Sequence, residues 1–184
     1  MITALDHVVV LTPDIDAGTR AYQTLLGGAP SWRYTGGGAA RALFTLDNMT
    51  LELVAPDGKG EDASRIGAVL AEQGEGLASL CFRTNDIAKM HRRLDRLTLK
   101  PEPVAEVEAR DDASGATLSW KRTRAATEVA HGVRLFFLEL GSERPRSATT
   151  AEAPITSMDH VVVATTDPER AAALYGARLG LDMA

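Results

Sequence analysis

A stretch of 23 residues near the start of the chain returns near its end. Residues 5–27 and 158–180, aligned at an offset of 153, are identical at ten positions, and the longest shared run is Asp-His-Val-Val-Val. A fainter copy lies at residues 77–99, which match residues 5–27 at six positions with an offset of 72. Self-similarity at fixed spacing indicates that the chain is built from copies of one supersecondary unit.

The first unit, about residues 1–58, is predicted to contain a strand, a helix and three further strands. Residues 5–11 form a short, valine-rich apolar run that is typical of a buried strand. Asp14 is suited to cap a helix that ends at Gly27. Three β-like runs follow at residues 32–34, 42–46 and 50–54, separated by glycine-rich and Asp-Asn turn signals.

The second unit, about residues 75–140, repeats this order after a connecting helix at residues 64–73. Its expected elements are a strand at 77–83, a helix after Asp86, and strands near 104–109, 116–122 and 133–140. Residues 141–157 are rich in Pro, Ser, Thr and Ala and are predicted to be a linker. Residues 158–184 should form the opening strand (158–164) and helix of a further, incomplete unit that contributes little to the first pair.

Composition narrows the class of protein. With 184 residues, 45% hydrophobic and 24% charged, the chain is suited to a globular fold with a sizeable core. A net charge of −5 argues against general nucleic-acid binding. Because no apolar run approaches the roughly 20 residues that span a bilayer, and no signal-peptide pattern is present, we expect a cytoplasmic protein without membrane contact. The single Cys81 is expected to be a buried strand residue.

Paired β-α-β-β-β units that open with Asp-His-Val-Val-Val resemble the vicinal oxygen chelate superfamily. This superfamily includes glyoxalase I, methylmalonyl-CoA epimerase, extradiol dioxygenases and bleomycin-resistance proteins. The resemblance covers residues 1–140 as one full pair and implies an α+β, glyoxalase-like fold in which the two units form a cupped mixed sheet. It also implies one divalent metal ion, held by ligands from the first and last strand of each unit.

Carried over position by position, the resemblance gives three metal ligands. They are His7 in the first strand, Glu52 in the last strand of the first unit, and Glu139 in the last strand of the second. The fourth position falls on Ser79, which is a poor ligand. Carboxylates in apolar strands are costly to bury alone, and a cation between them would compensate that cost. The alternatives are that Glu52 faces solvent and that Glu139 forms a structural salt bridge.

One imidazole and two carboxylates suit Mg, Mn, Ni, Co or Zn acting as a Lewis acid. Such a site favours a lyase or isomerase that removes a proton beside a carbonyl of a small substrate with vicinal oxygens and passes through an enediolate. Glu139 or Glu52 would then act as the catalytic base. Ser79, Trp120 and Arg122 are candidate substrate contacts, and the basic cluster around Arg122 is suited to an anionic group.

Two other functions compete with this hypothesis. A metal-free protein of the bleomycin-resistance type would sequester a small molecule, although the few aromatic residues argue against a large flat one. An extradiol-type dioxygenase needs two histidines and one carboxylate around Fe(II), and Ser79 occupies the place of the second histidine. A second copy of the chain is the candidate protein partner, in a homodimer whose sheet the unfinished unit would complete.

Overall fold

The computed structural model describes residues 1–152 and 154–182 and contains one mixed eight-stranded sheet. Its strands lie in the order β2-β3-β4-β1-β5-β8-β7-β6. Each strand was predicted from the sequence, and the α+β cupped sheet is confirmed. The strands are β1 (Ile2–Leu11), β2 (Trp32–Gly36), β3 (Ala39–Thr45), β4 (Thr50–Pro56), β5 (Gly76–Thr84), β6 (Ala105–Arg110), β7 (Thr117–Arg124) and β8 (Arg134–Leu140).

The predicted helix caps are also confirmed. Asp14 accepts hydrogen bonds of 2.9 Å from two backbone N–H groups of the first turn of α1, and Asp86 accepts one of 2.8 Å in α3. Gly27 ends α1 with a φ of 76°, a conformation that favours glycine. The helices are α1 (Ile15–Leu26), α2 (Glu61–Gln73), α3 (Ile87–Arg96), a 3-10 helix at Thr127–Ala130, and α4 (Pro168–Ala172), which continues as a π-helix over Ala173–Arg178.

The two units meet at the centre of the sheet. Here β1 pairs antiparallel with β5, and Val8 lies opposite Leu80. Each of these strands also pairs in parallel with the last strand of its own unit, β4 or β8. Because Leu80 follows Val8 by 72 residues, the offset of the sequence repeat, a pseudo-twofold axis passes between these two residues.

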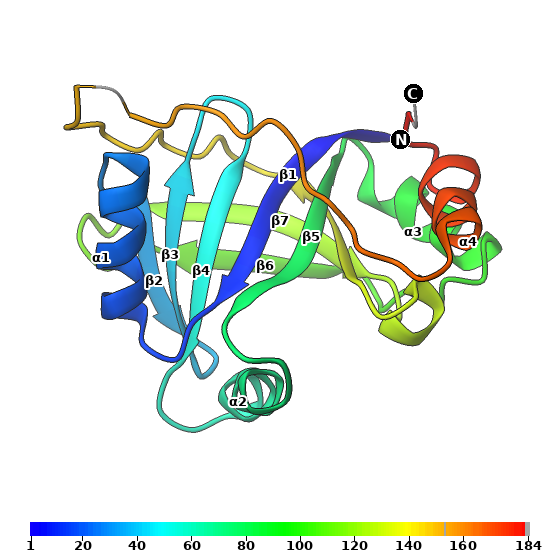
Figure 1. Ribbon diagram of the computed structural model, residues 1–184, viewed down its shortest axis with the longest axis horizontal. Coiled ribbons are helices and arrows are strands. Elements are labelled where there is room, and N and C mark those ends of the chain that lie inside the picture. Colours follow the sequence, from blue (N-terminus) through cyan, green and yellow to red (C-terminus); the bar gives the residue numbers. More distant parts are fainter. Residues whose placement is uncertain (153, 183–184) are drawn as a thin grey trace.

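The sheet has one face that packs in the core and one that is concave. Val8 and Val10 are buried in the main core with residues of α3 and the end of α1, whereas His7 and Val9 face the concave side, as alternation along a strand requires. The sheet curls until β6 and β7 lie behind the strands of the first unit (Figure 1). Its two ends are joined where Asp111, after β6, accepts the N–H of β2 residue Arg33 at 2.9 Å.

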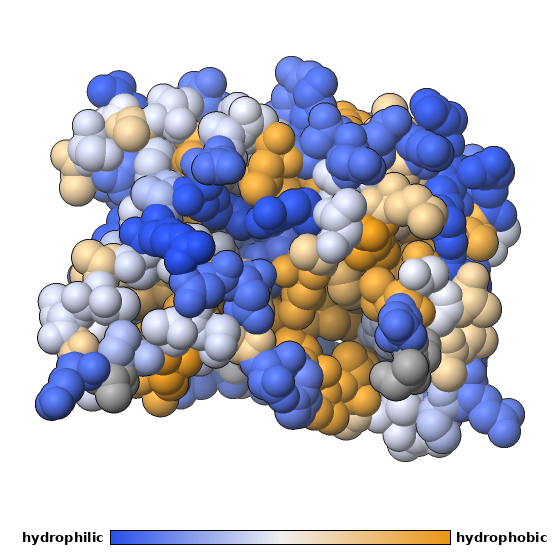
Figure 2. All heavy atoms as spheres, turned by 90° about the horizontal axis from the view of Figure 1, so that it is seen from above, coloured by the Kyte–Doolittle hydropathy of each residue, from blue (hydrophilic) through white to orange (hydrophobic). Residues whose placement is uncertain are grey.

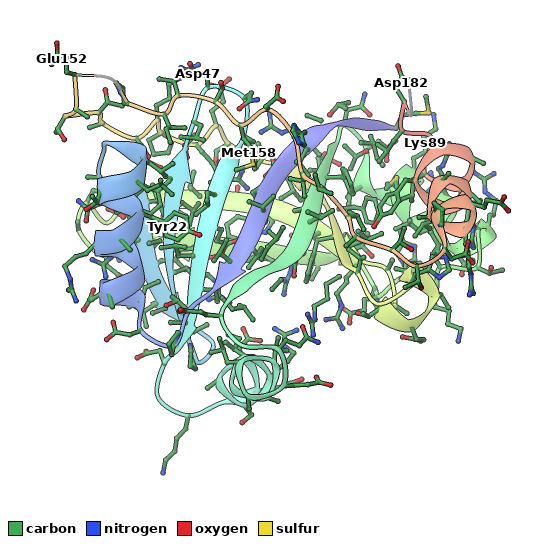
Figure 3. All side chains as sticks on the ribbon, viewed as in Figure 1. Tyr22, Asp47, Lys89, Glu152, Met158 and Asp182 are labelled. Atoms are coloured by element: carbon green, nitrogen blue, oxygen red, sulfur yellow. The ribbon has the colours of Figure 1, made fainter. Side chains whose placement is uncertain are left out.

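The predicted linker packs against the first unit. The backbone N–H of Ser147 donates to the carbonyl of Thr45 at 3.1 Å, and that of Asp47 donates to the carbonyl of Thr156 at 2.7 Å. Met158 is fixed over β4 by reciprocal hydrogen bonds with Asn48 of 2.7 and 3.1 Å (Figure 3). This segment then crosses in front of the sheet towards α4 (Figure 1).

Residues 158–182 differ from expectation, and residues 183–184 of the predicted unit lie outside the described residues. Residues 158–164 do not form the predicted strand, because β1 already occupies the place between β4 and β5 that the repeated sequence would take. The helix predicted after Asp167 is present. Its residue Leu174 and the following Leu179 are 1% and 3% exposed within the main core. The described part of this segment therefore completes the core of the first pair rather than adding little to it.

Seen from above, hydrophobic side chains gather towards the middle and right of the surface, while hydrophilic groups cover its left part (Figure 2). Val162, in the segment that failed to form a strand, is 74% exposed. Among the residues that the structure describes, no helix has the length and apolar character needed to cross a membrane.

Candidate functional site

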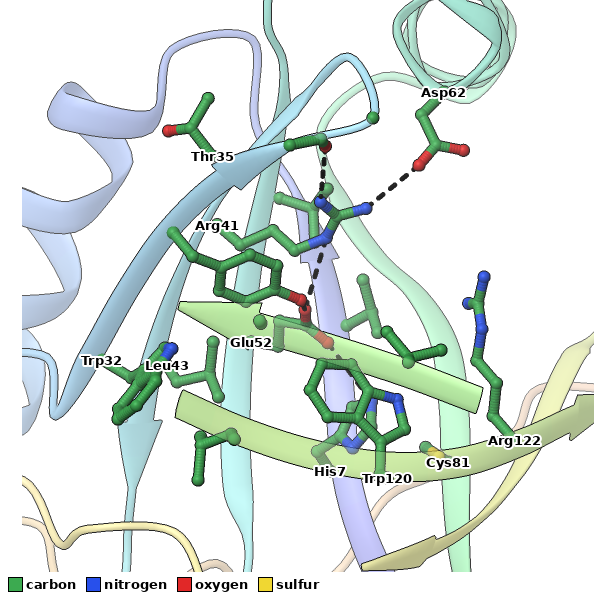
Figure 4. Close-up of a pocket in the computed structure, with 18 of the residues that line it drawn as sticks. His7, Trp32, Thr35, Arg41, Leu43, Glu52, Asp62, Cys81, Trp120 and Arg122 are labelled. Atoms are coloured by element: carbon green, nitrogen blue, oxygen red, sulfur yellow. Dashed lines mark hydrogen bonds and ion pairs between the residues drawn. The ribbon is translucent and has the colours of Figure 1, made fainter. Parts of the chain in front are cut away.

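The concave face of the sheet encloses a cavity of about 940 Å³. Its walls come from both units, since β1 and β4 of the first and β5, β7 and β8 of the second all direct side chains into it (Figure 4). The cavity is therefore the candidate site, and what it can do depends on the charged groups that line it.

A histidine and a carboxylate lie together in the first-unit half of the cavity. His7 Nε2 is 3.3 Å from Glu52 Oε2, and their side chains are only 12% and 15% exposed. The hydroxyl of Tyr34 donates to Glu52 Oε1 at 3.4 Å, and Arg41 Nε lies 3.7 Å from the same oxygen (Figure 4). Arg41 is in turn held by Asp62 at 3.1 Å. Glu52 therefore faces the cavity within a set of fixed donors.

The other ring nitrogen of His7 contacts a fully buried carboxylate. His7 Nδ1 lies 2.7 Å from Asp6 Oδ1, and Asp6 also accepts hydrogen bonds from Arg83 Nε at 2.7 Å and Arg144 at 2.5 Å. Burial alone would raise the pKa of Asp6, but the hydrogen bond with His7 and the charge of Arg144 lower it well below its usual range. An ionised Asp6 fixes the ring so that Nε2 faces Glu52.

The surroundings of His7 favour its charged form. Burial alone would lower the pKa of the imidazole, but Cys81, the hydrogen bond with Asp6 and the charge of Glu52 raise it to about 10. Burial and the nearby Glu52 raise the pKa of Tyr34, and burial raises that of the Cys81 thiol. At neutral pH His7 is thus an imidazolium, and the phenol of Tyr34 remains a hydrogen-bond donor.

A family model described as a glyoxalase-like domain matches residues 5–180 of the chain. The chain belongs to the glyoxalase-like domain family. This confirms the resemblance to the vicinal oxygen chelate superfamily that the repeated sequence indicated.

One relative and several similar solved structures carry the name of an epimerase. The ethylmalonyl-CoA/methylmalonyl-CoA epimerase of Cereibacter sphaeroides is 31% identical over 97 residues, which are 51% of this chain and 70% of the relative. Among solved structures, a variant of Streptomyces coelicolor methylmalonyl-CoA epimerase in complex with 2-nitronate-propionyl-CoA matches with a TM-score of 0.61 and 20% identity, over 77% of this chain and 100% of that one. Methylmalonyl-CoA epimerase from Mycobacterium tuberculosis matches with a TM-score of 0.58 and 25% identity, over 75% and 88%.

Glu139 lies away from His7 and Glu52. Its Oε2 accepts the backbone N–H of Ile87 at 2.7 Å, at the N-terminus of α3. Its strand neighbours Phe137 and Leu138 alternate between the core and the cavity, so Glu139 shares the core side with Phe137. The structure thus does not bring together the three ligands predicted from the sequence.

Strand register explains why Glu139 does not lie at the ligand position that the sequence predicted for it. Glu52 lies in line with Val9, and the residue 72 positions after Val9 is Cys81, which lies in line with Phe136. Phe136 is therefore the second-unit equivalent of Glu52. The position carried over from the resemblance, Glu139, lies three residues further along β8. A shift by an odd number of residues moves a side chain to the other face of a sheet.

The donors present in this glyoxalase-like domain do not fit the four-ligand metal set that the resemblance implied. His7 and Glu52 fill the two positions of the first unit, whereas Ser79 and Phe136 occupy those of the second. Over residues 1–152 and 154–182, no group of three His, Cys, Asp or Glu side chains is arranged to hold a metal ion.

All three predicted substrate contacts line the cavity. Ser79 is 7% exposed, Trp120 lies edge-on to Tyr34 with ring centroids 6.5 Å apart, and the Arg122 guanidinium lies 5.9 Å from the centre of the Phe136 ring. Sequence reasoning did not single out Tyr34, Arg41 or Asp6. Alternation along β2 and β3 was the available signal for the first two, and the position next to His7 was the signal for Asp6.

Proposed function

We propose that this glyoxalase-like domain is an isomerase of the epimerase type, which moves a proton at a carbon next to a carbonyl group of a small acyl substrate. The observation that carries the proposal is the 3.3 Å contact between His7 Nε2 and Glu52 Oε2 inside a cavity large enough for a substrate. The epimerase activity named for the Cereibacter sphaeroides relative supports the same class of reaction.

In this proposal Glu52 is the catalytic base. Its carboxylate takes the proton from the carbon beside the carbonyl, and the electron pair of that C–H bond moves to give an enolate with its charge on the carbonyl oxygen. The His7 imidazolium stabilises that oxygen electrostatically. The enolate then turns its other face towards Glu52, and the protonated Glu52 returns the proton to that face, which gives the epimer and restores the carboxylate. Tyr34 and Arg41 keep Glu52 in position through the contacts already described.

No step in this proposal runs through a metal ion, because the donor set does not fit one. A divalent ion bound by His7, Glu52 and Glu139 stays a hypothesis from the sequence, and it would require the Glu139 side chain to cross from the core side of the sheet. A two-histidine, one-carboxylate iron site meets the same difficulty, since Ser79 occupies the place of the second histidine.

The experiment uses methylmalonyl-CoA, the substrate named for the relatives, as a probe. Purified protein is incubated with it in D₂O, and loss of the proton at the carbon between the carbonyls is followed by NMR against a protein-free control. We expect exchange with the native chain and a decrease of about 10²- to 10⁴-fold in Glu52→Gln, since the catalytic base is lost. Glu139→Gln, the same chemical change outside the cavity, should exchange like the native chain. Equal exchange in native and Glu52→Gln protein would contradict the proposal.

Sequestration of a small molecule is the second candidate function. The observation that favours it is the cluster of Trp32, Tyr34 and Trp120 on one side of the cavity, three of the nine aromatic residues of the chain. Aromatic side chains of this kind bind planar or apolar groups. Tight binding of methylmalonyl-CoA without exchange of its proton would favour this function over isomerisation.

A further inference from the structure

The two halves of the cavity differ in whether the positive charges of their arginines are paired with carboxylates. In the first unit, Arg41 lies between Glu52 and Asp62, and Arg65 contacts Asp62 at 2.5 Å. In the second unit, Arg122 and Arg134 line the cavity. Arg134 donates to the side-chain oxygen of Gln73 at 3.4 Å, but no described carboxylate lies within ion-pair distance of either arginine. The second-unit half therefore carries uncompensated positive charge.

Two arginines of β7 lie over the ring of Phe136 in β8. The guanidinium of Arg122 lies 5.9 Å from the centre of Phe136, and that of Arg124 lies 5.8 Å from it. Arg134 precedes Phe136 by two residues in β8 and directs its side chain to the same face. When a guanidinium stacks on a ring, its flat face contacts the ring. The N–H groups at its edge are then available to donate to a carboxylate or phosphate.

An unpaired donor supports the same location. Arg124 binds Glu102 through its terminal nitrogen, but its Nε is buried with no hydrogen-bond partner among the described residues. A buried N–H group without a partner is costly, and a bound acceptor would relieve that cost.

Strand register places this cluster relative to the proposed base. Glu52, Val9, Ser79 and Arg134 follow one another across β4, β1, β5 and β8. Three strand spacings separate the first from the last, or about 14 Å along the sheet. All four residues line the cavity. One molecule can therefore place its reacting carbon near Glu52 and a charged group near the arginines, with the Ser79 hydroxyl between them.

We infer that Arg122 and Arg134, flanking Phe136 in the second-unit half of the cavity, form a binding site for an oxyanion of the substrate, which is a carboxylate or a phosphoryl group. This inference deepens the proposed function, on which it rests for the identity of the molecule as a substrate. In the second unit, Ser79 and Phe136 stand at the positions where the resemblance implied metal ligands. In this inference the second unit binds the anion and the first unit transfers the proton.

The test measures anion binding by the full chain and does not depend on catalysis. Malonate and inorganic phosphate are titrated by calorimetry into native protein, into Arg122→Gln/Arg134→Gln and into Arg110→Gln, in a buffer of low chloride. Arg110 is the matched control because it also lines the cavity without a carboxylate partner among the described residues, but it lies at the end of β6 beside Asp111. If the double variant does not fold, as judged by thermal unfolding, Arg122→Gln alone takes its place.

We expect the native chain to bind at least one of the two anions, and the tighter one identifies the source of the oxyanion. The double variant should bind it about ten- to a hundredfold more weakly, as expected for loss of charge-assisted hydrogen bonds, while Arg110→Gln stays within about twofold. Glu52→Gln should retain anion binding even where proton exchange is lost, which separates this inference from the proposed function. No binding by the native chain, or equal binding by native and double-variant protein, would overturn the inference.

Discussion

The carboxylate of Asp111 accepts the backbone N–H of Arg33 at 2.9 Å, and this contact joins the two ends of an eight-stranded sheet. The other oxygen of Asp111 accepts the N–H and hydroxyl of Ser114, both at 2.7 Å. We expect Asp111→Ala to lower the free energy of unfolding by about 1–3 kcal/mol, because buried donors lose their acceptor. Asp112→Ala, at an exposed neighbour, should change it by about 0.5 kcal/mol or less. Urea unfolding measures both.

The same carboxylate should make stability depend on pH. Burial alone would raise the pKa of Asp111, but the hydrogen bonds from Arg33 and Ser114 lower it below its usual value. Because the pKa is lower in the folded state than in the unfolded chain, where it is about 3.9, the stabilisation is complete above that value and is lost as pH falls through the folded pKa. The difference in unfolding free energy between native and Asp111→Asn protein should therefore shrink in acid. A difference that stays constant with pH would contradict this.

Glu139 should contribute to the stability of the fold rather than to ligand binding in the cavity. Its carboxylate accepts the N–H of Ile87 at the start of α3, where a negative charge is favourable. We expect Glu139→Ala to lower the free energy of unfolding by about 1 kcal/mol. Thermal unfolding measures this loss, and titration with malonate provides the control. Weaker malonate binding together with unchanged stability would place Glu139 in the site after all.

The C-terminal segment should be part of the folding unit. Leu174 is 1% exposed in the main core, so Leu174→Ala should lower the free energy of unfolding by about 2–5 kcal/mol. Val162→Ala is the matched control, because Val162 is 74% exposed and its truncation should cost about 0.5 kcal/mol or less. Chemical denaturation of the two variants compares them. Equal stabilities would mean that the segment does not pack as described.

Two arginines of the predicted linker should differ in importance. Arg144 is 10% exposed and contacts the buried Asp6, whereas Arg146 is 70% exposed and contacts Asp47 at the surface. Arg144→Ala should lower the free energy of unfolding by about 1–3 kcal/mol, since a buried carboxylate loses one of its partners. Arg146→Ala should cost at most about 1 kcal/mol, as surface ion pairs do. Similar losses in both variants would contradict this difference.

Much of the fold could be predicted because the repeat, the caps and the turns are local signals. Asp14, Asp86 and Gly27 act through neighbours within a few residues, and each was predicted from its position alone. The pairing of the two units also followed from the 72-residue offset, which reappears as the alignment of Val8 with Leu80.

The site could be predicted only in part, because it depends on register and on contacts between distant residues. His7, Glu52 and Glu139 were all assigned through the resemblance, which did not determine the register of β8 and therefore the face that Glu139 takes. Arg144 reaches Asp6 across 138 residues of sequence, and no local pattern indicates such a contact. The failed strand at residues 158–164 has a similar cause, since strand formation depends on free partners.

The duplicated Asp-His pair makes the same side-chain contact in both copies, since Nδ1 of His160 lies 2.7 Å from Asp159, just as His7 does from Asp6. One copy is the central strand, and the other is a segment without strand pairing in which the His160 side chain is 69% exposed. The same five-residue sequence thus occurs twice, and the sheet has one place for it between β4 and β5. Synthesis from the N-terminus gives the first copy priority, because β1 can pair with β4 and β5 before residue 158 has been made. When the full chain refolds from denaturant, both copies are present from the start. We therefore expect residues 159–163 to compete with β1 for pairing with β4 and β5 during refolding.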